Sequence, residues 1–206
     1  MCNLYRMEKA PDAIAKLVRE LGRQLEFPDG VPNFEPRVIR ITDRAPILRG
    51  EGADAPLALV ERRWSWPGPG GRPVFNFRAE GRRFAPAERC IAIADAFYEF
   101  TASSEPGSKR KARWQFTWPE HEWFGIAGLI RRDPAAGEAF TLLTCPPGPD
   151  IAPYHSRQIA VLSPGDCLRW LDGATEEELL APLPAGTLAV TGEAGTRAPQ
   201  NSLFGV

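Results

Sequence analysis

The sequence opens with Met1 followed directly by a cysteine, Cys2. Cysteine is small enough for methionine aminopeptidase to remove Met1, so we expect the mature chain to begin with Cys2. An N-terminal cysteine carries a free α-amine and a thiol on adjacent carbons. The amine can condense with an aldehyde to an imine, and the thiol can then close a five-membered thiazolidine ring. An α-amine has an ordinary pKa of about 7.7–8.0, so an appreciable fraction is neutral at physiological pH.

Two other interpretations of Cys2 stay open. It could be an N-terminal nucleophile that uses its own amine as the base, an arrangement known for threonine. A cysteine at this position could also have no chemical role.

Three short segments carry side chains suited to a catalytic site. Asn76 and Arg78 follow a loop rich in glycine and proline. Glu99 stands between two aromatic residues at the end of an apolar run, where a buried carboxyl would have a raised pKa and could act as a general acid or base. His155, one of two histidines, lies in a loop before a predicted strand. The structural alternatives are a Glu99 in water at a strand edge and a His155 without a catalytic role.

The segment from Arg37 to Arg89 is strongly basic. It contains eleven arginines and six acidic residues, a net charge of +5 in a chain whose net charge is −1. Arginine suits bidentate phosphate contacts, and arginines mixed with aromatic residues are typical of a surface that binds single-stranded nucleic acid. The alternative is a solvated sheet face with aromatic residues in the core. The interleaved aromatic residues are Trp64, Trp66, Phe75, Phe77 and Phe84.

The cysteines and histidines argue against a metal site or a metal cofactor. The four cysteines show no C-x-x-C spacing, and there are only two histidines. In a reducing cytosol all four cysteines should be free thiols, and Cys90, Cys145 and Cys167 read as small core residues. No apolar run is long enough to span a membrane, and the N-terminus lacks the apolar core of a signal peptide. We therefore expect a cytoplasmic protein.

The pattern of predicted elements indicates an α+β fold with a mostly antiparallel, barrel-like sheet and a few flanking helices. One helix is predicted over residues 11–26, and two short ones over residues 164–171 and 175–181. Nothing splits the chain, so residues 1–206 are expected to form one domain. The predicted strands cover residues 3–6, 37–42, 57–64, 74–78, 90–100, 113–118, 123–132, 140–145, 159–163 and 188–192.

Four motifs occur in an order that resembles the SOS-response-associated peptidase (SRAP) family, whose members shield abasic sites in DNA. They are Met1-Cys2, the N-x-R motif at Asn76 and Arg78, the Phe-x-Glu-aromatic motif around Glu99, and the His-x-Arg motif at His155 and Arg157. The segment from Trp64 to Pro67 also looks like a branch of that family. The resemblance implies an SRAP-like fold.

Three segments depart from the usual family pattern. Asn3-Leu4 replaces Gly-Arg after the cysteine, which alters one expected phosphate contact. The segment from Pro32 to Pro36 replaces the usual Tyr-Asn-x-Ala-Pro loop. Gln158-Ile159-Ala160 follows Arg157 where Met-Pro is common.

The resemblance implies a mechanism in which the Cys2 amine forms an imine with the ring-opened aldehyde of an abasic site and the thiol closes a thiazolidine. Glu99 would open the sugar by proton transfer. Asn76 would orient the N-terminus or the sugar. His155 would donate a proton to the sugar oxygen or contact a phosphate. The expected DNA contacts are Arg78, Arg157, Arg82, Arg83, Trp64 and Trp66.

The implied partner is single-stranded DNA with an abasic site, because an aldehyde inside a duplex is hard to reach. We expect a monomer without cofactor, metal or membrane partner, which associates with the nucleoid after damage. One alternative is an N-terminal-nucleophile peptidase of the SOS response that uses the same Cys2, Asn76, Glu99 and His155, with Asn76 stabilising an oxyanion. Another is a single-strand binding module without catalysis.

Overall fold

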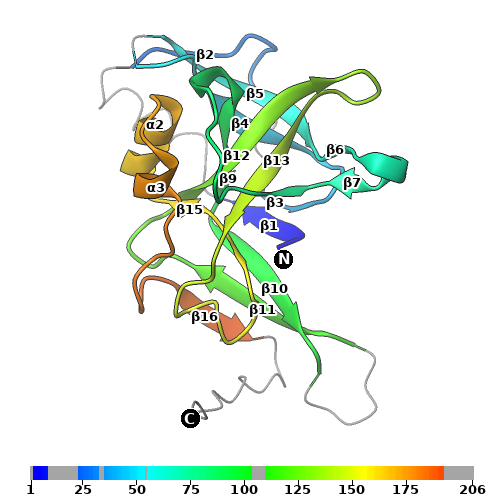
Figure 1. Cartoon of the computed structure of the whole chain (residues 1–206), viewed down its shortest axis with the longest axis vertical. Coiled ribbons are helices and arrows are strands. Elements are labelled where there is room, and N and C mark those ends of the chain that lie inside the picture. The colour runs from blue at the N-terminus through cyan, green and yellow to red at the C-terminus, as the bar shows by residue number, and fades with distance from the viewer. Residues whose placement is uncertain (1, 9–22, 33–34, 54, 104–109, 193–206) are drawn as a thin grey trace.

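Strands dominate the computed structural model, which describes residues 2–8, 23–32, 35–53, 55–103 and 110–192 (Figure 1). The described helices are α2 (Pro164–Leu171) and α3 (Glu176–Leu179), with short 3-10 turns η1 (Pro69–Gly71) and η2 (Pro86–Glu88). The strands are β1 (Leu4–Met7), β2 (Leu25–Glu26), β3 (Arg37–Arg40), β4 (Arg44–Arg49), β5 (Leu57–Trp64), β6 (Trp66–Pro67), β7 (Pro73–Val74), β8 (Asn76–Arg78), β9 (Arg89–Ala94), β10 (Ala96–Thr101), β11 (Ala112–Thr117), β12 (Phe124–Asp133), β13 (Gly137–Cys145), β14 (Gln158–Ile159), β15 (Val161–Leu162) and β16 (Ala189–Gly192).

Five strands form a closed barrel. β5, β4, β9, β12 and β13 pair in this order through antiparallel ladders, and a parallel pairing of Phe140 with Trp64 joins β13 back to β5. Closure removes the exposed edges that an open sheet would present. The interior is filled by apolar side chains such as Ile47, Val60 and Phe124. The predicted α+β class with a mostly antiparallel, barrel-like sheet is confirmed.

A second sheet lies below the barrel in Figure 1, with the strand order β16-β11-β10-β1-β3. The segment predicted as one strand over residues 90–100 is divided at Asp95, so that β9 belongs to the barrel and β10 to this second sheet. Asp95 fixes the change of direction. Its N–H donates to the Arg6 carbonyl, and its carboxylate accepts hydrogen bonds from the Arg6 side chain and the Glu8 N–H. These contacts tie β1 to the start of β10.

Helix α2 packs on the outside of the barrel through an apolar face that includes Cys167, Trp170 and Leu171. Ser163 caps the helix, because its hydroxyl accepts the Asp166 N–H. The close approach needs a glycine in β12: a Cβ added at Gly125 would lie 2.2 Å from the Cys167 sulfur. Both predicted C-terminal helices are confirmed. Thr175 caps α3, because its hydroxyl accepts the Glu178 N–H.

Other elements also differ from the prediction. Of the helix expected over residues 11–26, residues 11–22 lie outside the described residues, while Leu25–Glu26 forms β2 and pairs parallel with β5. The central strand β4 was not predicted, because it contains Pro46 and a proline argues against a strand inside a sheet. Pro46 is tolerated because the ladder with β9 begins only at Ile47.

Candidate active site around Cys2

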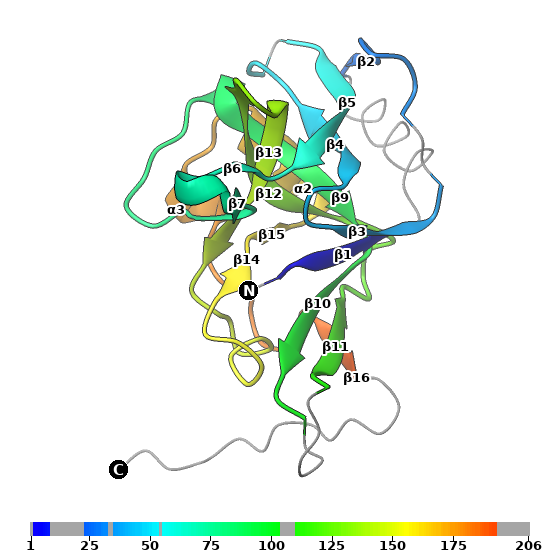
Figure 2. The same cartoon turned by 90° about the vertical axis from the view of Figure 1, so that its right-hand side faces the viewer.

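The N-terminal strand brings Cys2 into the interior between the barrel and the second sheet. β1 lies between β3 and β10, with Tyr5 opposite Phe97 (Figure 2). Cys2 lies two residues before β1 and is 1% exposed. Strand pairing on both sides of β1 holds this end of the chain in place, and Cys2 belongs to the buried apolar cluster that also contains Tyr5 and Phe97.

The carbonyl and the thiol of Cys2 are both held by hydrogen bonds. The Asn76 amide donates to the Cys2 carbonyl at 2.8 Å, and the Cys2 thiol donates to the Leu4 carbonyl at 3.2 Å. Burial, followed by the nearby Glu99 charge, raises the pKa of the thiol to about 12, although backbone hydrogen bonds and the positive N-terminus partly oppose this. The thiol is therefore protonated at neutral pH.

Glu99 is a buried carboxyl that contacts the backbone nitrogen of Cys2. It lies in β10 opposite Trp114 of β11 and is 1% exposed, which excludes the alternative of a solvated glutamate at a strand edge. Burial raises the pKa of Glu99 to about 7. The positive N-terminus and a hydrogen bond from the Cys2 backbone lower it in part. A carboxyl with this pKa can both give and take a proton near neutral pH.

Asn76 reaches the site from a third element. Its strand, β8, runs parallel to β13 on the barrel, with Asn76 opposite Leu142. The amide nitrogen holds the Cys2 carbonyl, and the buried Oδ1 atom has no hydrogen-bond partner among the described residues. Arg78 lies two residues further along the same strand and is exposed. The arrangement leaves one buried acceptor beside Cys2 and a cation at the end of the same strand.

His155 is held in the loop between β13 and β14. Its Nδ1 atom lies 3.0 Å from both the backbone nitrogen and the carbonyl oxygen of Arg157. Burial lowers the pKa of His155, and the positive charges of the N-terminus and of Arg157 act in the same direction. The preceding Tyr154 packs its ring 4.9 Å from that of Trp114, the cross-strand neighbour of Glu99. The loop therefore belongs to the same site.

The four arginines predicted to contact DNA lie in different environments. Arg157 donates to both carboxylate oxygens of Glu80, at 2.5 and 2.8 Å, and also to Thr144, so it braces the histidine loop. Arg83 pairs with carboxylates of α3, and Arg82 lies over the Phe77 ring at 4.7 Å. Only Arg78 sits on the same strand as a residue that contacts Cys2. Phosphate binding by these four side chains stays a prediction.

The two tryptophans predicted to contact DNA are core residues. Trp64 is 0% exposed and donates its indole N–H to the Phe75 carbonyl at 2.9 Å. Trp66 is 4% exposed, and the Arg131 guanidinium covers its ring at 4.0 Å. Stacking on a nucleobase needs an open ring face, which neither residue has. Alternation along β5 and the closure of the barrel turn the Trp64 ring inward, and the Arg131 guanidinium covers the Trp66 ring.

The structure also contains a basic cluster that the sequence motifs did not indicate. Arg110, Lys111 and Arg113 border a pocket together with Asn3 and Phe100. In the sequence, the two basic residues Arg110 and Lys111 stand directly before β11. They lie outside the arginine-rich segment from Arg37 to Arg89, on which the prediction of a basic surface was based. Cys90, Cys145 and Cys167 are buried, as predicted. Within the described ranges, no group of three or more His, Cys, Asp or Glu side chains could hold a metal ion, and no helix is long and apolar enough to cross a membrane.

Comparison with known proteins gives one family and several related folds. A model of the family described as SOS response associated peptidase (SRAP) matches residues 1–192. A protein of Bacteroides thetaiotaomicron is similar in structure, with a TM-score of 0.66 and 17% identity over 93% of this chain and 91% of that one. A protein of Bordetella bronchiseptica has a TM-score of 0.62 and 23% identity over 93% and 99%. A phage-related protein of the same organism has a TM-score of 0.65 and 21% identity over 93% of each chain. No curated protein sequence matches.

Proposed function

The chain belongs to the SOS response associated peptidase (SRAP) family, and from this premise we propose that it captures abasic sites in single-stranded DNA through Cys2. The product is a thiazolidine that links the N-terminal cysteine to the sugar. The observation that carries the proposal is the hydrogen bond between the backbone nitrogen of Cys2 and the buried Glu99 carboxyl. When Met1 is removed, that nitrogen becomes the reactive α-amine, already beside an acid–base group.

The reaction divides into two steps that balance in atoms and electrons. The neutral amine adds to the aldehyde carbon of the ring-opened sugar, and loss of one water gives the imine. The thiol sulfur then adds to the imine carbon while its proton is transferred to the imine nitrogen. One C–N bond and one C–S bond form, one water leaves, and no oxidant or reductant is needed.

Each neighbouring side chain has a role that follows from its position. Glu99, with a pKa of about 7, gives a proton to the departing oxygen and takes one from the thiol. Asn76 fixes the Cys2 carbonyl and offers its buried Oδ1 atom to a hydroxyl or amine donor. His155, whose pKa is lowered, is neutral at pH 7 and can donate to the sugar oxygen without adding a second positive charge beside the amine.

The thiol pKa favours this chemistry over the peptidase alternative. A cysteine peptidase attacks with its thiolate, and a pKa of about 12 leaves only about one thiol in 10⁵ ionised at pH 7. Thiazolidine formation begins with the amine, so the thiol can stay protonated until the imine has formed. The peptidase remains the second candidate, because the family carries that description.

The test is a denaturing gel of the mature protein with a single-stranded oligonucleotide that contains one abasic site. Mass spectrometry first verifies that Met1 is absent. A band that resists denaturation should form with wild type and with Cys90→Ala, a matched control at a buried core cysteine. Cys2→Ala should give none. Cys2→Ser should form a stable link only when borohydride reduces the imine. Absence of a wild-type band with Met1 removed would contradict the proposal.

A further inference from the structure

A cavity lies on the side of β8 that faces away from Cys2. Neighbouring side chains of a strand point to opposite faces, so Asn76 reaches Cys2 while Phe77 turns to the other side. No side chain with a role in the proposed reaction lines this cavity, which has a volume of about 410 Å³. Its walls combine aromatic rings with guanidinium groups, contributed by Trp66, Phe77, Phe84, Arg82, Arg83 and Arg131.

The cavity borders an open strand edge. β12 extends to Asp133, but β9 pairs with it only as far as Leu129, which lies opposite Arg89. Among the described residues, no strand pairs with this edge of β12 over residues 130–133. Ile130 and Glu88, which lie just beyond the last pair on the two chains, both line the cavity. The cavity and the open edge therefore adjoin.

The pairing of β13 shows which main-chain groups of β12 point to the open edge. The Leu142 N–H donates at 3.0 Å to a carbonyl just before β8, which lies on the opposite edge of β13 from β12. The adjacent Thr141 therefore turns its main chain toward β12 and its partner Leu129. By the same alternation, Ile130 and Arg132 direct their N–H and carbonyl groups to the open edge. Such an edge accepts an extended peptide as an added strand.

The charges along this edge indicate which peptide fits. Arg131 and Arg132 of β12 and Arg82 of the cavity wall are exposed. Arg131 lies over the Trp66 ring at 4.0 Å and 3.9 Å from a carboxylate oxygen of Asp133. A second copy of this chain would place arginines opposite arginines, and like charges in that position are destabilising. An acidic peptide is the complementary strand.

The cavity suits one large aromatic side chain of such a peptide. Its lining is apolar where Leu129 and Ile130 contribute, and an aromatic ring can also pack on the guanidinium groups. Glu88, the one carboxylate in the described lining, accepts the Ala85 N–H at 3.0 Å. The cavity therefore offers rings and cations to its ligand.

We propose that the open edge of β12 and the adjoining cavity dock an acidic, extended segment of a partner protein. The segment adds a strand along residues 130–132 and places an aromatic side chain in the cavity. Main-chain hydrogen bonds supply the pairing, while the arginines and the cavity supply the selectivity. The docking surface lies on the other side of β8 from Cys2 and does not depend on the proposed function.

The first measurement selects peptides from a random phage-displayed library on the immobilised full chain. The test variant combines Arg131→Gln and Arg132→Gln. The control combines Arg44→Gln and Arg169→Gln, two exposed arginines outside the cavity whose removal gives the same net charge. Thermal melting verifies that both variants fold.

The sequences enriched on wild type should combine acidic residues with an aromatic one. In fluorescence anisotropy, the consensus peptide should bind the test variant at least about tenfold more weakly than wild type, because hydrogen bonds to charged groups are lost. The control should match wild type within about twofold. A consensus without acidic residues, equal affinity for the two variants, or no sequence that binds wild type below about 1 mM would overturn the proposal.

Hydrogen exchange measured by NMR locates the bound peptide. In the free protein, the Arg132 amide should exchange faster than the Arg131 amide, which faces β13. The consensus peptide should slow exchange at Ile130 and Arg132 by at least about tenfold, and protection confined to other strands would refute the added strand.

An undamaged single-stranded oligonucleotide is the second ligand in the exchange measurement. If the oligonucleotide protects the Ile130 and Arg132 amides and the peptide does not, the surface binds nucleic acid and the proposal fails. Neither measurement uses the Cys2 reaction, so the proposed function and this inference stand or fall separately.

Discussion

Glu99 and Cys2 lie close together in the protein interior. Burial, and then the charge of the Glu99 carboxylate, therefore raise the pKa of the Cys2 thiol. Burial raises the pKa of the carboxyl to about 7 and that of the thiol to about 12. At neutral pH the thiol is therefore protonated, while the carboxyl is about half ionised. The carboxyl can therefore act first as an acid and then as a base, as the reaction of the amine requires.

Glu99→Gln should slow crosslinking by about 10²-fold, because a positioned acid–base group contributes rates of that order. The rate profile between pH 5.5 and 8.5 should also lose the inflection near pH 7 that the carboxyl produces in wild type. Single-turnover rates across this range test the point. An unchanged inflection in the variant would assign it to another group.

Glu99→Gln should also change the way in which the free energy of unfolding depends on pH. The folded pKa of Glu99 lies above the ordinary value of 4.5, so the folded state binds the proton more tightly than the unfolded state. The contribution of Glu99 to the free energy of unfolding of wild type should fall by at most about 3 kcal/mol as the pH rises from 4.5 to 7. Glu99→Gln should not show this loss, whereas Glu120→Gln, at an exposed glutamate, should retain it. Urea unfolding at several pH values measures the difference.

At the scale of elements, the turn after β5 carries local strain. Ser65 has a φ of 96°, its hydroxyl is buried without a partner among the described residues, and its N–H donates to the Phe140 carbonyl at 2.7 Å. This conformation lets the chain leave the barrel directly after the pairing that closes it. A serine in this region of φ is strained, because its Cβ is crowded.

Ser65→Gly should stabilise the protein by about 1 kcal/mol, since it relieves the strain and removes the unpaired hydroxyl. Ser65→Ala removes only the hydroxyl and should fall between wild type and the glycine variant. Urea unfolding provides the free energies. A glycine variant less stable than wild type would show that the serine is favourable here.

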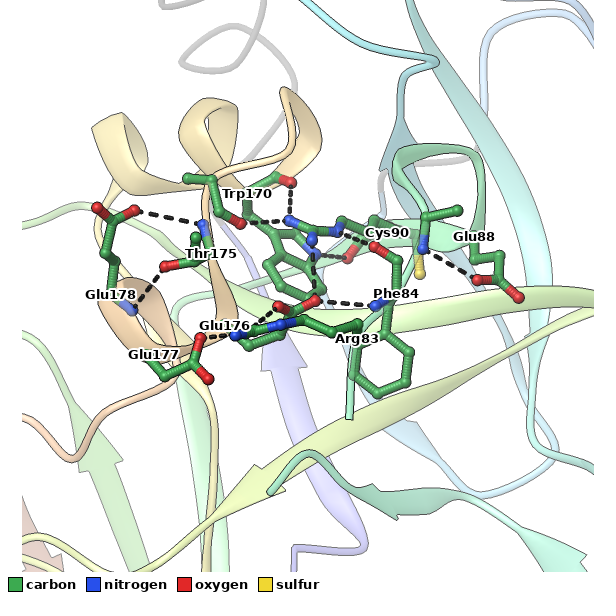
Figure 3. A network of polar contacts seen from close by, with 12 residues as sticks. Arg83, Phe84, Glu88, Cys90, Trp170, Thr175, Glu176, Glu177 and Glu178 are labelled. Carbon is green, nitrogen blue, oxygen red and sulfur yellow. Dashed lines mark hydrogen bonds and ion pairs between the residues drawn. The ribbon is translucent and has the colours of Figure 1, made fainter. Parts of the chain in front are cut away.

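A second element-scale feature ties α2 and α3 to the barrel (Figure 3). Arg89, 4% exposed, donates to the Glu176 carboxylate and to the Trp170 and Ala174 carbonyls, and its guanidinium lies 4.0 Å from the Trp170 ring. Glu176 also accepts the Phe84 N–H at 2.9 Å. Burial opposes ionisation of Glu176, but these hydrogen bonds and the nearby arginines lower its pKa overall.

Glu176→Gln should destabilise the protein by about 3 kcal/mol, because it leaves a buried guanidinium without its counter-charge. The adjacent Glu177→Gln is the matched control. Glu177 is exposed and pairs with Arg83, so its loss should cost much less stability than the loss of Glu176. Denaturant unfolding compares the two, and equal losses would contradict a special role for the buried pair. Crosslinking by the folded fraction should be unchanged in both.

At the scale of the whole molecule, the site depends on two sheets that are joined through β9 and β10. The barrel supplies Asn76 through β8, and the second sheet supplies Glu99 through β10. β16 covers the other edge of β11, with Trp114 opposite Gly192, and Leu188 is buried beside it. The support of Glu99 therefore extends to the last strand of the family match.

A chain that ends after Gly192 should melt within about 2 °C of wild type and crosslink at the same rate, because all described strands remain. A chain that ends after Gly186 loses β16 and buried Leu188, and should melt several degrees lower. Crosslinking should fall with it, since β11 would become an unsupported edge next to β10. Melting curves and gel rates of the two truncations test this. Equal stability would show that β16 is dispensable.

Much of the local structure and the reactive residues could be predicted from the sequence. The strand β5 was predicted over residues 57–64 and the helix α2 over residues 164–171, and both are confirmed. Cys2 and Glu99 were recognisable because their chemistry follows from residue type and position. β4 could not be predicted, because the tolerance of Pro46 depends on where its neighbour strand begins. Local sequence preferences were therefore enough to predict individual elements, but not which strands pair with one another.

The sequence by itself determined the fold class, the possible reactivity of Cys2 and the candidate partners Asn76, Glu99 and His155. Only the tertiary structure decided which charges and rings are open to a ligand. Arg157 is paired with Glu80 and Trp64 is enclosed by the barrel, while Arg78 is exposed on the strand that carries Asn76. Composition cannot show this, because burial and pairing depend on contacts between segments that are distant in the chain.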